Sequence, residues 1–392
     1  VHFLYNMEKL FIFNKKLLTN HNKKLYIVLG VDYKTQIKNH YFIKLFRRLF
    51  IMKKIGMLLG SIILASALVA CGEKKEEVKT DAPAGEKLSI GLTAYKFDDN
   101  FIALFRKAFE AEAMAKADTV EVTGIDSQNS VATEKEQIEA VLEKGVKAFA
   151  INLVDASAAD GIINLLKEKN VPVVFYNRKP SDEAIASYDK LYYVGIDPNA
   201  QGIAQGELIE KLWKENPDLD LNKDGVIQYV MLTGEPGHPD AVARTKYSIS
   251  TLNDHGIKTE ELHKDTAMWD TANAKDKMDA WLSGPNGSKI EVVICNNDGM
   301  ALGAIESMKA AGKVLPTFGV DALPEAIVKI EAGEMAGTVL NDAKGQASAT
   351  FNMVVNLAEG KEPTEGTDLK LDNKIILIPS IGIDKSNVAD FK

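Results

Sequence analysis

Short apolar runs alternate with amphipathic stretches of helical length from residue 88 onward. The runs are residues 88–93, 120–123, 148–151, 171–175, 192–195, 226–232, 292–294, 317–320 and 338–340. Apolar strands that alternate with helices are typical of a parallel sheet covered by helices on both faces. Nine strands over roughly 300 residues exceed one compact sheet, so the sequence predicts an α/β fold of two doubly wound parallel-sheet domains.

Polar side chains follow most of these runs, where each predicted strand ends. In open α/β sheets, ligands bind just beyond the carboxyl ends of the strands. For any single residue, an Asp or Asn that only caps the next helix is an alternative interpretation. Polar ends after seven runs nevertheless predict a shared ligand site, with the candidates Asp98, Asp99, Asn100, Asn152, Asn177, Arg178, Glu235, His238, Asp240, Arg244, Asn296, Asn297, Asp298, Asp321, Asn341 and Asp342.

The residue types at these strand ends suit a ligand with several hydroxyl groups. Carboxylates, amides and a guanidinium make hydrogen bonds at fixed angles to groups that both donate and accept. A pyranose sugar is such a ligand, and its apolar C–H faces commonly pack on aromatic rings. Phe101 and Trp269 are candidates for these rings, although either could belong to the core instead.

A catalytic interpretation rests on His238 and Asp240, which could act as a general base and its orienting carboxylate. No G-x-S-x-G nucleophile motif lies nearby, no glycine-rich phosphate loop follows a strand, and no His/Cys cluster has zinc spacing. A glycosidase needs two carboxylates across one bond, and nothing singles out such a pair. We therefore predict a binding protein and no enzyme; an exported sugar-sensing or sugar-processing protein with the same cleft is the alternative.

The segment that starts at Met52 has the layout of a secretory signal peptide. Two lysines precede an uncharged run, residues 55–70, and then Cys71. Residues 68–71, Leu-Val-Ala-Cys, resemble the lipobox of bacterial lipoproteins, whereas a buried helix followed by a chance cysteine is the alternative. We predict a signal peptide (52–70), a lipidated Cys71 that begins a flexible tether (71–87), and an exported protein anchored to a membrane. We expect residues 1–51 to be an over-extended reading frame; a genuine extension is the other interpretation.

The body of the chain is acidic. Residues 71–392 hold 35 basic and 53 acidic residues, a net charge near −18, whereas residues 1–70 hold 12 basic and 2 acidic ones. An acidic surface disfavours nucleic acid and anionic lipid headgroups as partners. The sequence therefore predicts a neutral or cationic ligand, no nucleic acid, and membrane contact through the lipid anchor only.

Residues 220–228 have the D-x-N-x-D-G spacing of a calcium loop. Such a loop normally ends in a bidentate Glu at position 12, which here is Met231. Either the loop is only a polar turn, or a carboxylate from elsewhere in the chain completes the site.

Several irregular stretches resemble the bacterial D-galactose/D-glucose-binding proteins, the substrate-binding components of sugar ABC transporters. They are YKFDDNF (95–101), AINLVD (150–155), GEPGHPD (234–240) with Arg244, DTAMWDT (265–271), NND (296–298), FGVDALP (318–324) and TVLND (338–342). The resemblance extends from residue 88 to the C-terminus. It implies the type I periplasmic binding protein fold, with the sugar held between two domains.

The resemblance also implies roles for individual residues. The rings of Phe101 and Trp269 would cover the two faces of the sugar, with Asp99 near O4. The polar contacts would come from Asp99, Asn152, His238, Asp240, Arg244, Asn297, Asp321 and Asn341. A structural calcium ion (Ca2+) would be held by Asp220, Asn222, Asp224, the carbonyl of Val226, Gln228 and, from a distant strand, Glu291.

By the same resemblance, the chain crosses between its domains three times, near residues 195, 340 and 379. The N-terminal lobe would hold residues 88–195 and 341–377, and the C-terminal lobe residues 196–340 and 378–392. Closure of this hinge would bury D-galactose or D-glucose and present both lobes to an ABC permease and its ATPase. A chemoreceptor is a further partner in related proteins, and the protein is expected to be a monomer.

Overall fold

A computed structural model describes residues 87–392, which belong to one compact unit, Pro83–Lys392. The expected reading-frame extension (1–51), the signal peptide (52–70), and Cys71 with its tether up to residue 86 lie outside the described residues. Within the described range, no helix combines the length and the apolar character that a membrane span needs.

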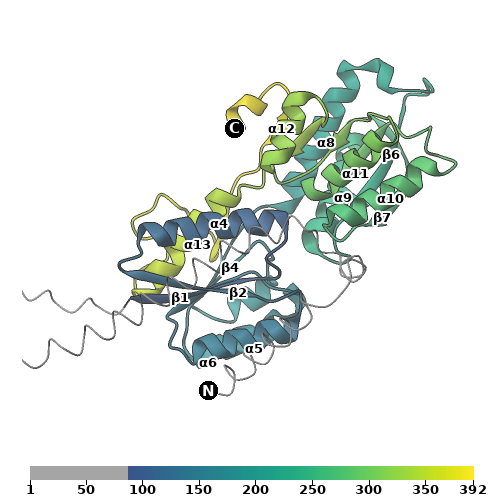
Figure 1. Ribbon diagram of the computed structural model, residues 1–392. Helices are drawn as coiled ribbons and strands as arrows, with labels where there is room; N and C mark the ends of the chain where they lie inside the picture. The colour runs from purple at the N-terminus through teal and green to yellow at the C-terminus, as the bar shows by residue number, and fades with distance from the viewer. Residues whose placement is uncertain (1–86) are drawn as a thin grey trace, which may run out of the picture. The chain divides into compact units, whose positions relative to one another are not determined.

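The first lobe is built on a six-stranded sheet of order β11-β5-β4-β3-β1-β2, in which neighbouring strands are parallel. Its strands are β1 (Leu88–Ala94), β2 (Val120–Asp126), β3 (Ala148–Ile151), β4 (Val173–Tyr176), β5 (Leu191–Gly195) and β11 (Ile375–Leu377). Its helices lie on both faces of the sheet (Figure 1): α4 (Asn100–Ala115) and α13 (Ala343–Ala358) cover one face, and α5 (Val131–Leu142), α6 (Ala159–Glu168) and α7 (Asp182–Ala186) pack on the other.

The second lobe repeats this plan with a sheet of order β12-β10-β9-β8-β6-β7, in which only β12 is antiparallel to its neighbour. Its strands are β6 (Val226–Thr233), β7 (Lys258–Thr266), β8 (Val292–Cys295), β9 (Thr317–Phe318), β10 (Gly337–Val339) and β12 (Gly382–Asp384). The helices are α8 (Pro198–Glu215), α9 (Pro239–Asp254), α10 (Thr271–Ser283), α11 (Asp298–Ala310) and α12 (Pro324–Ala332). Three short 3-10 helices complete the described elements: 156–158 in the first lobe, and 217–219 and 388–391 in the second.

The two sheets confirm the prediction of two doubly wound α/β domains. Every predicted apolar run contributes a strand. All of these strands except β2 lie inside their sheets, where both faces of a strand are covered and its sequence is mostly apolar. The prediction missed β7, β11 and β12. The sequence of β7, KTEELHKDT, is largely polar because β7 is an edge strand of its sheet and none of its residues is fully buried.

The chain passes from one sheet to the other three times: after β5, after β10 and after β11. Aromatic packing joins α4 to the sheet of the first lobe. The rings of Phe105 on α4 and Tyr176 on β4 stack with centroids 3.8 Å apart, and the Tyr176 hydroxyl donates to the carbonyl of Thr93 at 2.7 Å. These contacts fix the N-terminal end of α4 above the carboxyl ends of β1 and β4, where the site lies.

In the second lobe, α8 and α9 pack closely because small residues separate them. A Cβ added to Gly206 would lie 2.7 Å from the carbonyl oxygen of Ser248, closer than side chains approach. The close packing brings Gln201 of α8 within hydrogen-bond distance of Arg244 on α9, with Oε1 and Nε 2.9 Å apart. This position therefore needs glycine for packing rather than for a turn.

Candidate functional site

A cavity lies between the two lobes. Side chains from both lobes line it, and nearly all of them follow the carboxyl end of a strand. They are Tyr95, Asp99, Phe101, Ile102, Asn177, Arg178, His238, Asp240, Arg244, Trp269, Asn297, Asp321 and Asn341. The cavity is therefore where the strand-end rule places a ligand in an open α/β sheet.

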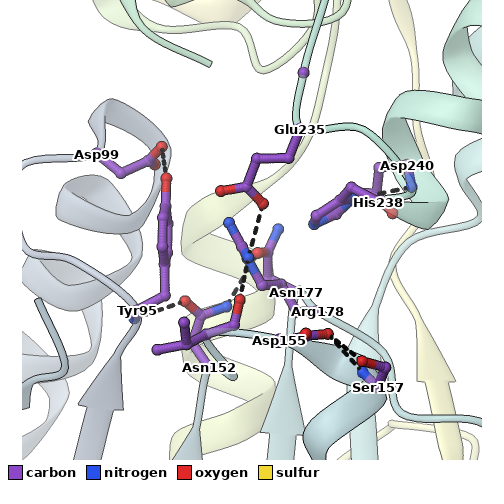
Figure 2. Close-up of polar contacts among 12 residues, drawn as sticks. Tyr95, Asp99, Asn152, Asp155, Ser157, Asn177, Arg178, Glu235, His238 and Asp240 are labelled. Atoms are coloured by element: carbon purple, nitrogen blue, oxygen red, sulfur yellow. Dashed lines mark hydrogen bonds and ion pairs between the residues drawn. The ribbon is translucent and has the colours of Figure 1, made fainter. Parts of the chain in front are cut away.

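Among the predicted sugar-contacting residues, all except Asn152 line this cavity. Asn152 is fully buried behind the cavity wall, where its Oδ1 accepts from the backbone N–H of Tyr95 at 3.1 Å. Its Nδ2 donates to Oδ1 of Asn177 at 3.1 Å (Figure 2). In this structure Asn152 therefore lies behind the cavity lining, where it holds Tyr95 and Asn177, and Asn177 itself lines the cavity.

Helix capping and ligand binding are not alternatives at this site, because three lining residues also cap helices. Asp99 Oδ1 accepts from the N–H of Ile102 at 2.9 Å, and Asn297 Oδ1 accepts from Met300 N–H at 2.9 Å. His238 accepts through Nδ1 from the N–H of Asp240 at 3.2 Å. The cap bond fixes one polar atom of each side chain and so orients the remaining atoms.

Strained backbone also shapes the cavity. Asn177, Trp269 and Asp321 all have positive φ angles, of 58°, 64° and 129°. Non-glycine residues adopt such angles at a cost of about 1–3 kcal/mol, and they concentrate at functional sites. Hydrogen bonds hold the strained turn after Asp321, because Leu323 N–H donates to Oδ2 of Asp298 at 2.9 Å.

The ring of Trp269 has a fixed place in the second lobe. It lies against Gly234, where an added Cβ would come within 2.1 Å of the ring. His238 packs against it edge-on, with ring centroids 5.2 Å apart. These contacts hold an aromatic face at the cavity, while buried Phe101 contributes from the first turn of α4.

Arg244 is the positive centre of the site. It is buried and donates to Gln201, to the carbonyl of Asn296 at 2.8 Å and to Oδ2 of Asp240 at 3.2 Å. Burial raises the pKa of the Asp321 carboxyl well above its ordinary value, and the Arg244 charge acts in the opposite direction. Burial likewise raises the pKa of Asp298 to about 6. The guanidinium therefore compensates a group of buried carboxylates.

His238 is held as a neutral ring. Burial lowers its pKa, and acceptance of a hydrogen bond at Nδ1 assigns the tautomer that carries its proton on Nε2. The Asp240 carboxylate pairs with Arg244 rather than with the imidazole. The structure therefore contradicts the alternative in which Asp240 orients His238 as a general base.

Sequence reasoning missed two lining residues, Tyr95 and Ile102. Asn177 and Arg178, which also line the cavity, were among the strand-end candidates but not among the sugar contacts that the resemblance implied. For Tyr95 the signal was weaker, since tyrosine at a strand end usually belongs to the core. Its hydroxyl donates to Oδ2 of Asp99 at 2.7 Å (Figure 2), which ties the cap residue to the cavity wall.

The predicted calcium-binding residues lie around the turn before β6. Asp220 accepts from the N–H groups of Asp224 and Gly225, at 3.1 and 2.8 Å. Glu291 is buried just ahead of β8, and its two oxygens accept from the N–H groups of Leu221 at 2.7 Å and Gln228 at 2.9 Å. The structure thus brings a distant carboxylate to the loop. Within residues 87–392, no three His, Cys, Asp or Glu side chains converge closely enough to hold a metal by themselves.

The chain matches a family model described as a periplasmic binding protein domain over residues 90–362. It is 56% identical over 302 residues to the D-galactose/methyl-galactoside binding periplasmic protein of Haemophilus influenzae, a match that covers 77% of this chain and 91% of that protein. It is 30% identical over 310 residues to a putative rhizopine-binding protein of Rhizobium meliloti, covering 78% of this chain and 92% of the relative.

Solved structures show the same fold. An ABC transporter solute binding protein from Bacillus halodurans with bound myo-inositol has a TM-score of 0.66 and 27% identity, over 79% of this chain and 98% of that one. An Actinobacillus succinogenes protein with bound D-allose, 19% identical, has a TM-score of 0.66 and covers 78% and 100%. The similarity confirms the predicted fold class, and these relatives are binding proteins rather than enzymes, as the sequence predicted.

Proposed function

This chain belongs to the periplasmic binding protein family, and we propose that it is the sugar receptor of an ABC transporter, with D-galactose or D-glucose as its ligand. The observation that carries the proposal is the cavity between the lobes, where an indole face adjoins carboxylates, amides and a guanidinium. Such a lining matches a pyranose, which offers C–H faces to a ring and hydroxyls to planar polar groups.

The choice of hexose rests on the 56% identical relative, whose name gives D-galactose and methyl-galactoside as ligands. Relatives named for ribose and xylitol are less similar, at 24% and 27% identity. We propose that Trp269 and Phe101 cover the faces of the ring and that Asp99 lies near O4. The remaining contacts would come from Asn177, in place of Asn152, and from His238, Asp240, Arg244, Asn297, Asp321 and Asn341.

The proposed mechanism is binding with lobe closure and no chemistry. Both lobes contribute to the lining, so a bound sugar contacts the two lobes only while they are together. The three crossings form the hinge, and the closed form would be recognised by the permease with its ATPase. We also propose that Cys71 anchors the protein to a membrane, facing outward, that it works as a monomer, and that a chemoreceptor is a second partner.

We further propose that the turn before β6 holds a structural calcium ion. In support, Nδ2 of Asn222 and Nε2 of Gln228 both donate to Oδ2 of Asp224, at 2.9 and 3.0 Å, and Oε1 of Gln228 is buried without a partner. With a cation bound, these amides could turn so that their oxygens face the ion together with the carboxylates. Calcium would be held by Asp220, Asn222, Asp224, Val226, Gln228 and Glu291, and would tie the turn to β8.

Isothermal titration tests the proposed function. Purified protein, freed of bound sugar by partial unfolding and refolding, is titrated with D-glucose, D-galactose, D-ribose and L-arabinose. We expect tight binding of one or both hexoses and no comparable binding of the pentoses. Absence of heat with all four sugars would contradict the proposal, and turnover of an aryl galactoside would instead indicate a sugar-processing protein.

Removing the closing carboxylate should abolish the response to calcium. Glu291→Gln is expected to melt about 5–10 °C below the wild type in calcium, since a bound ion contributes a few kcal/mol. In a chelator the difference should shrink to the part due to the hydrogen bonds that the Glu291 carboxylate accepts from Leu221 and Gln228, as followed by circular dichroism.

Glu260→Gln is the matched control for this prediction. Glu260 contacts Gln228 at 3.4 Å but lies outside the proposed ligand set, so its variant should keep the calcium response. If the melting temperature of the wild type is the same in calcium and in chelator, the loop is only a polar turn.

A further inference from the structure

One ion pair joins the two lobes. Arg178 follows β4 in the first lobe, and Glu235 follows β6 in the second, with NH1 and Oε2 2.9 Å apart (Figure 2). Both side chains are largely buried, at 5% and 18% exposure. Of the ion pairs found between residues 87 and 392, no other has its partners in different lobes.

The first lobe alone holds Arg178 in place. Its NH1 donates to the carbonyl of Val154 at 2.6 Å, and its guanidinium carbon lies 3.9 Å from the ring centroid of Tyr95. Neither contact depends on the second lobe. The guanidinium therefore stays oriented toward the cleft when the lobes separate, and little side-chain entropy is lost when Glu235 returns to it.

The pair stands between the ligand cavity and a second hollow. Arg178 and His238 line both spaces, whereas Glu235 lines only the outer one. The outer hollow is larger, and residues of both lobes border it, among them Val154 and Asp182 of the first lobe and Glu235 and Met268 of the second. A ligand that leaves the cavity on this side must pass the place where the guanidinium and the carboxylate meet.

We propose that Arg178 and Glu235 form a latch across the cleft, which keeps the lobes together around a bound ligand and slows its release. The inference rests on the proposed sugar-binding function, because it is the dissociation of the sugar that the latch retards. Glu235 acts without touching the sugar, as a residue that stabilises the closed form.

The charges around Arg178 limit the strength of the latch. Glu134 and Asp155 lie near the guanidinium in the first lobe, and neutral His238 lies near it in the second. Arg178 therefore keeps carboxylates nearby when the lobes open, so separation does not leave it isolated. Partly buried charge pairs across an interface act chiefly on dissociation. We expect loss of the pair to speed release by about 5- to 50-fold.

The test compares Glu235→Gln with the wild type by stopped flow, with tryptophan fluorescence reporting the binding of D-galactose and D-glucose. The variant keeps the shape of the side chain and removes its charge outside the ligand cavity. We expect faster dissociation by about 5- to 50-fold and an association rate changed by less than about threefold. Glu235→Asp keeps the charge but is one methylene shorter. It should also speed dissociation with little change in association, but by a smaller factor.

Asp182→Asn is the matched control. Asp182 lies in the same outer hollow and pairs with Lys179 at 2.6 Å, but both partners belong to the first lobe. It removes the same charge as Glu235→Gln without touching a contact between the lobes, so its dissociation rate should equal that of the wild type. Arg178→Gln, alone and combined with Glu235→Gln, completes a double-mutant cycle for the pair.

The outcomes separate the two proposals. Dissociation from Glu235→Gln within about twofold of the wild type would overturn the latch and leave sugar binding intact. Equal acceleration in Glu235→Gln and Asp182→Asn would also overturn it, because a general loss of negative charge would then be the cause. If the wild type binds neither hexose, the proposed function is wrong. The latch is then wrong too, because there is no bound sugar whose release it could slow.

Discussion

Trp269→Ala is expected to weaken hexose binding by about 2–4 kcal/mol, which is roughly a 30- to 1000-fold rise in Kd. The indole is the large aromatic face of the cavity, and Gly234 and His238 hold it in place. Its loss removes apolar contact with the sugar and opens the cavity to water. Isothermal titration with D-galactose and D-glucose measures the change.

Two variants sharpen this prediction. Trp269→Phe keeps an aromatic face and should lose less affinity than the alanine variant. Trp281→Ala is the control, because Trp281 stacks on His263 in the second lobe and does not line the cavity. It should lower the melting temperature and leave Kd unchanged. Near-normal affinity in Trp269→Ala would show that the sugar binds elsewhere.

Arg244→Met is expected to destabilise the protein by about 3–5 kcal/mol and to abolish hexose binding. The side chain is buried, and its guanidinium compensates the carboxylate of Asp240 and those of Asp298 and Asp321. Methionine fills a similar volume but leaves these groups without a counter-charge. Urea unfolding measures the free energy, with Lys211→Met as control: its pair with Asp384 is partly exposed and should contribute less than about 1 kcal/mol.

The loss of unfolding free energy caused by Arg244→Met should depend on pH. Burial raises the pKa of Asp321 and Asp298 in the folded state above the value near 4 of the unfolded chain. The folded state then holds protons that the unfolded state releases, so its stability falls as pH rises toward the folded pKa. Loss of Arg244 raises these pKa values further and extends the fall to higher pH.

We therefore expect the difference in unfolding free energy between Arg244→Met and wild type to be larger at pH 8 than at pH 5. Urea unfolding at both pH values measures it. An equal difference at the two pH values would indicate that the guanidinium acts through packing and hydrogen bonds alone.

Local patterns predicted most of the fold. The apolar runs predicted their strands because both faces of a central parallel strand are buried, so the pattern is visible without knowledge of the neighbours. The same reasoning failed for β7, β11 and β12. An edge strand such as β7 has one side in solvent, and short strands such as β11 and β12 hold their place through partners distant in sequence.

Asn152 shows the limit of the sequence at the site itself. Asn152 and Asn177 both follow apolar runs, and both present an amide at a strand end. In the structure Asn152 donates a hydrogen bond to Asn177, and of the two only Asn177 lines the cavity. Spacing along a strand cannot separate these two positions, because their difference depends on how β3, β4 and Tyr95 pack together.

What the sequence alone determined is the class of fold and the chemistry at the strand ends, because burial and residue type are local properties. Only the tertiary structure decided which of those ends share a cavity and that Glu235 reaches Arg178. These contacts join residues from different strands or from different lobes. Their partners are set by the packing of the sheets and helices, which no single stretch of sequence contains.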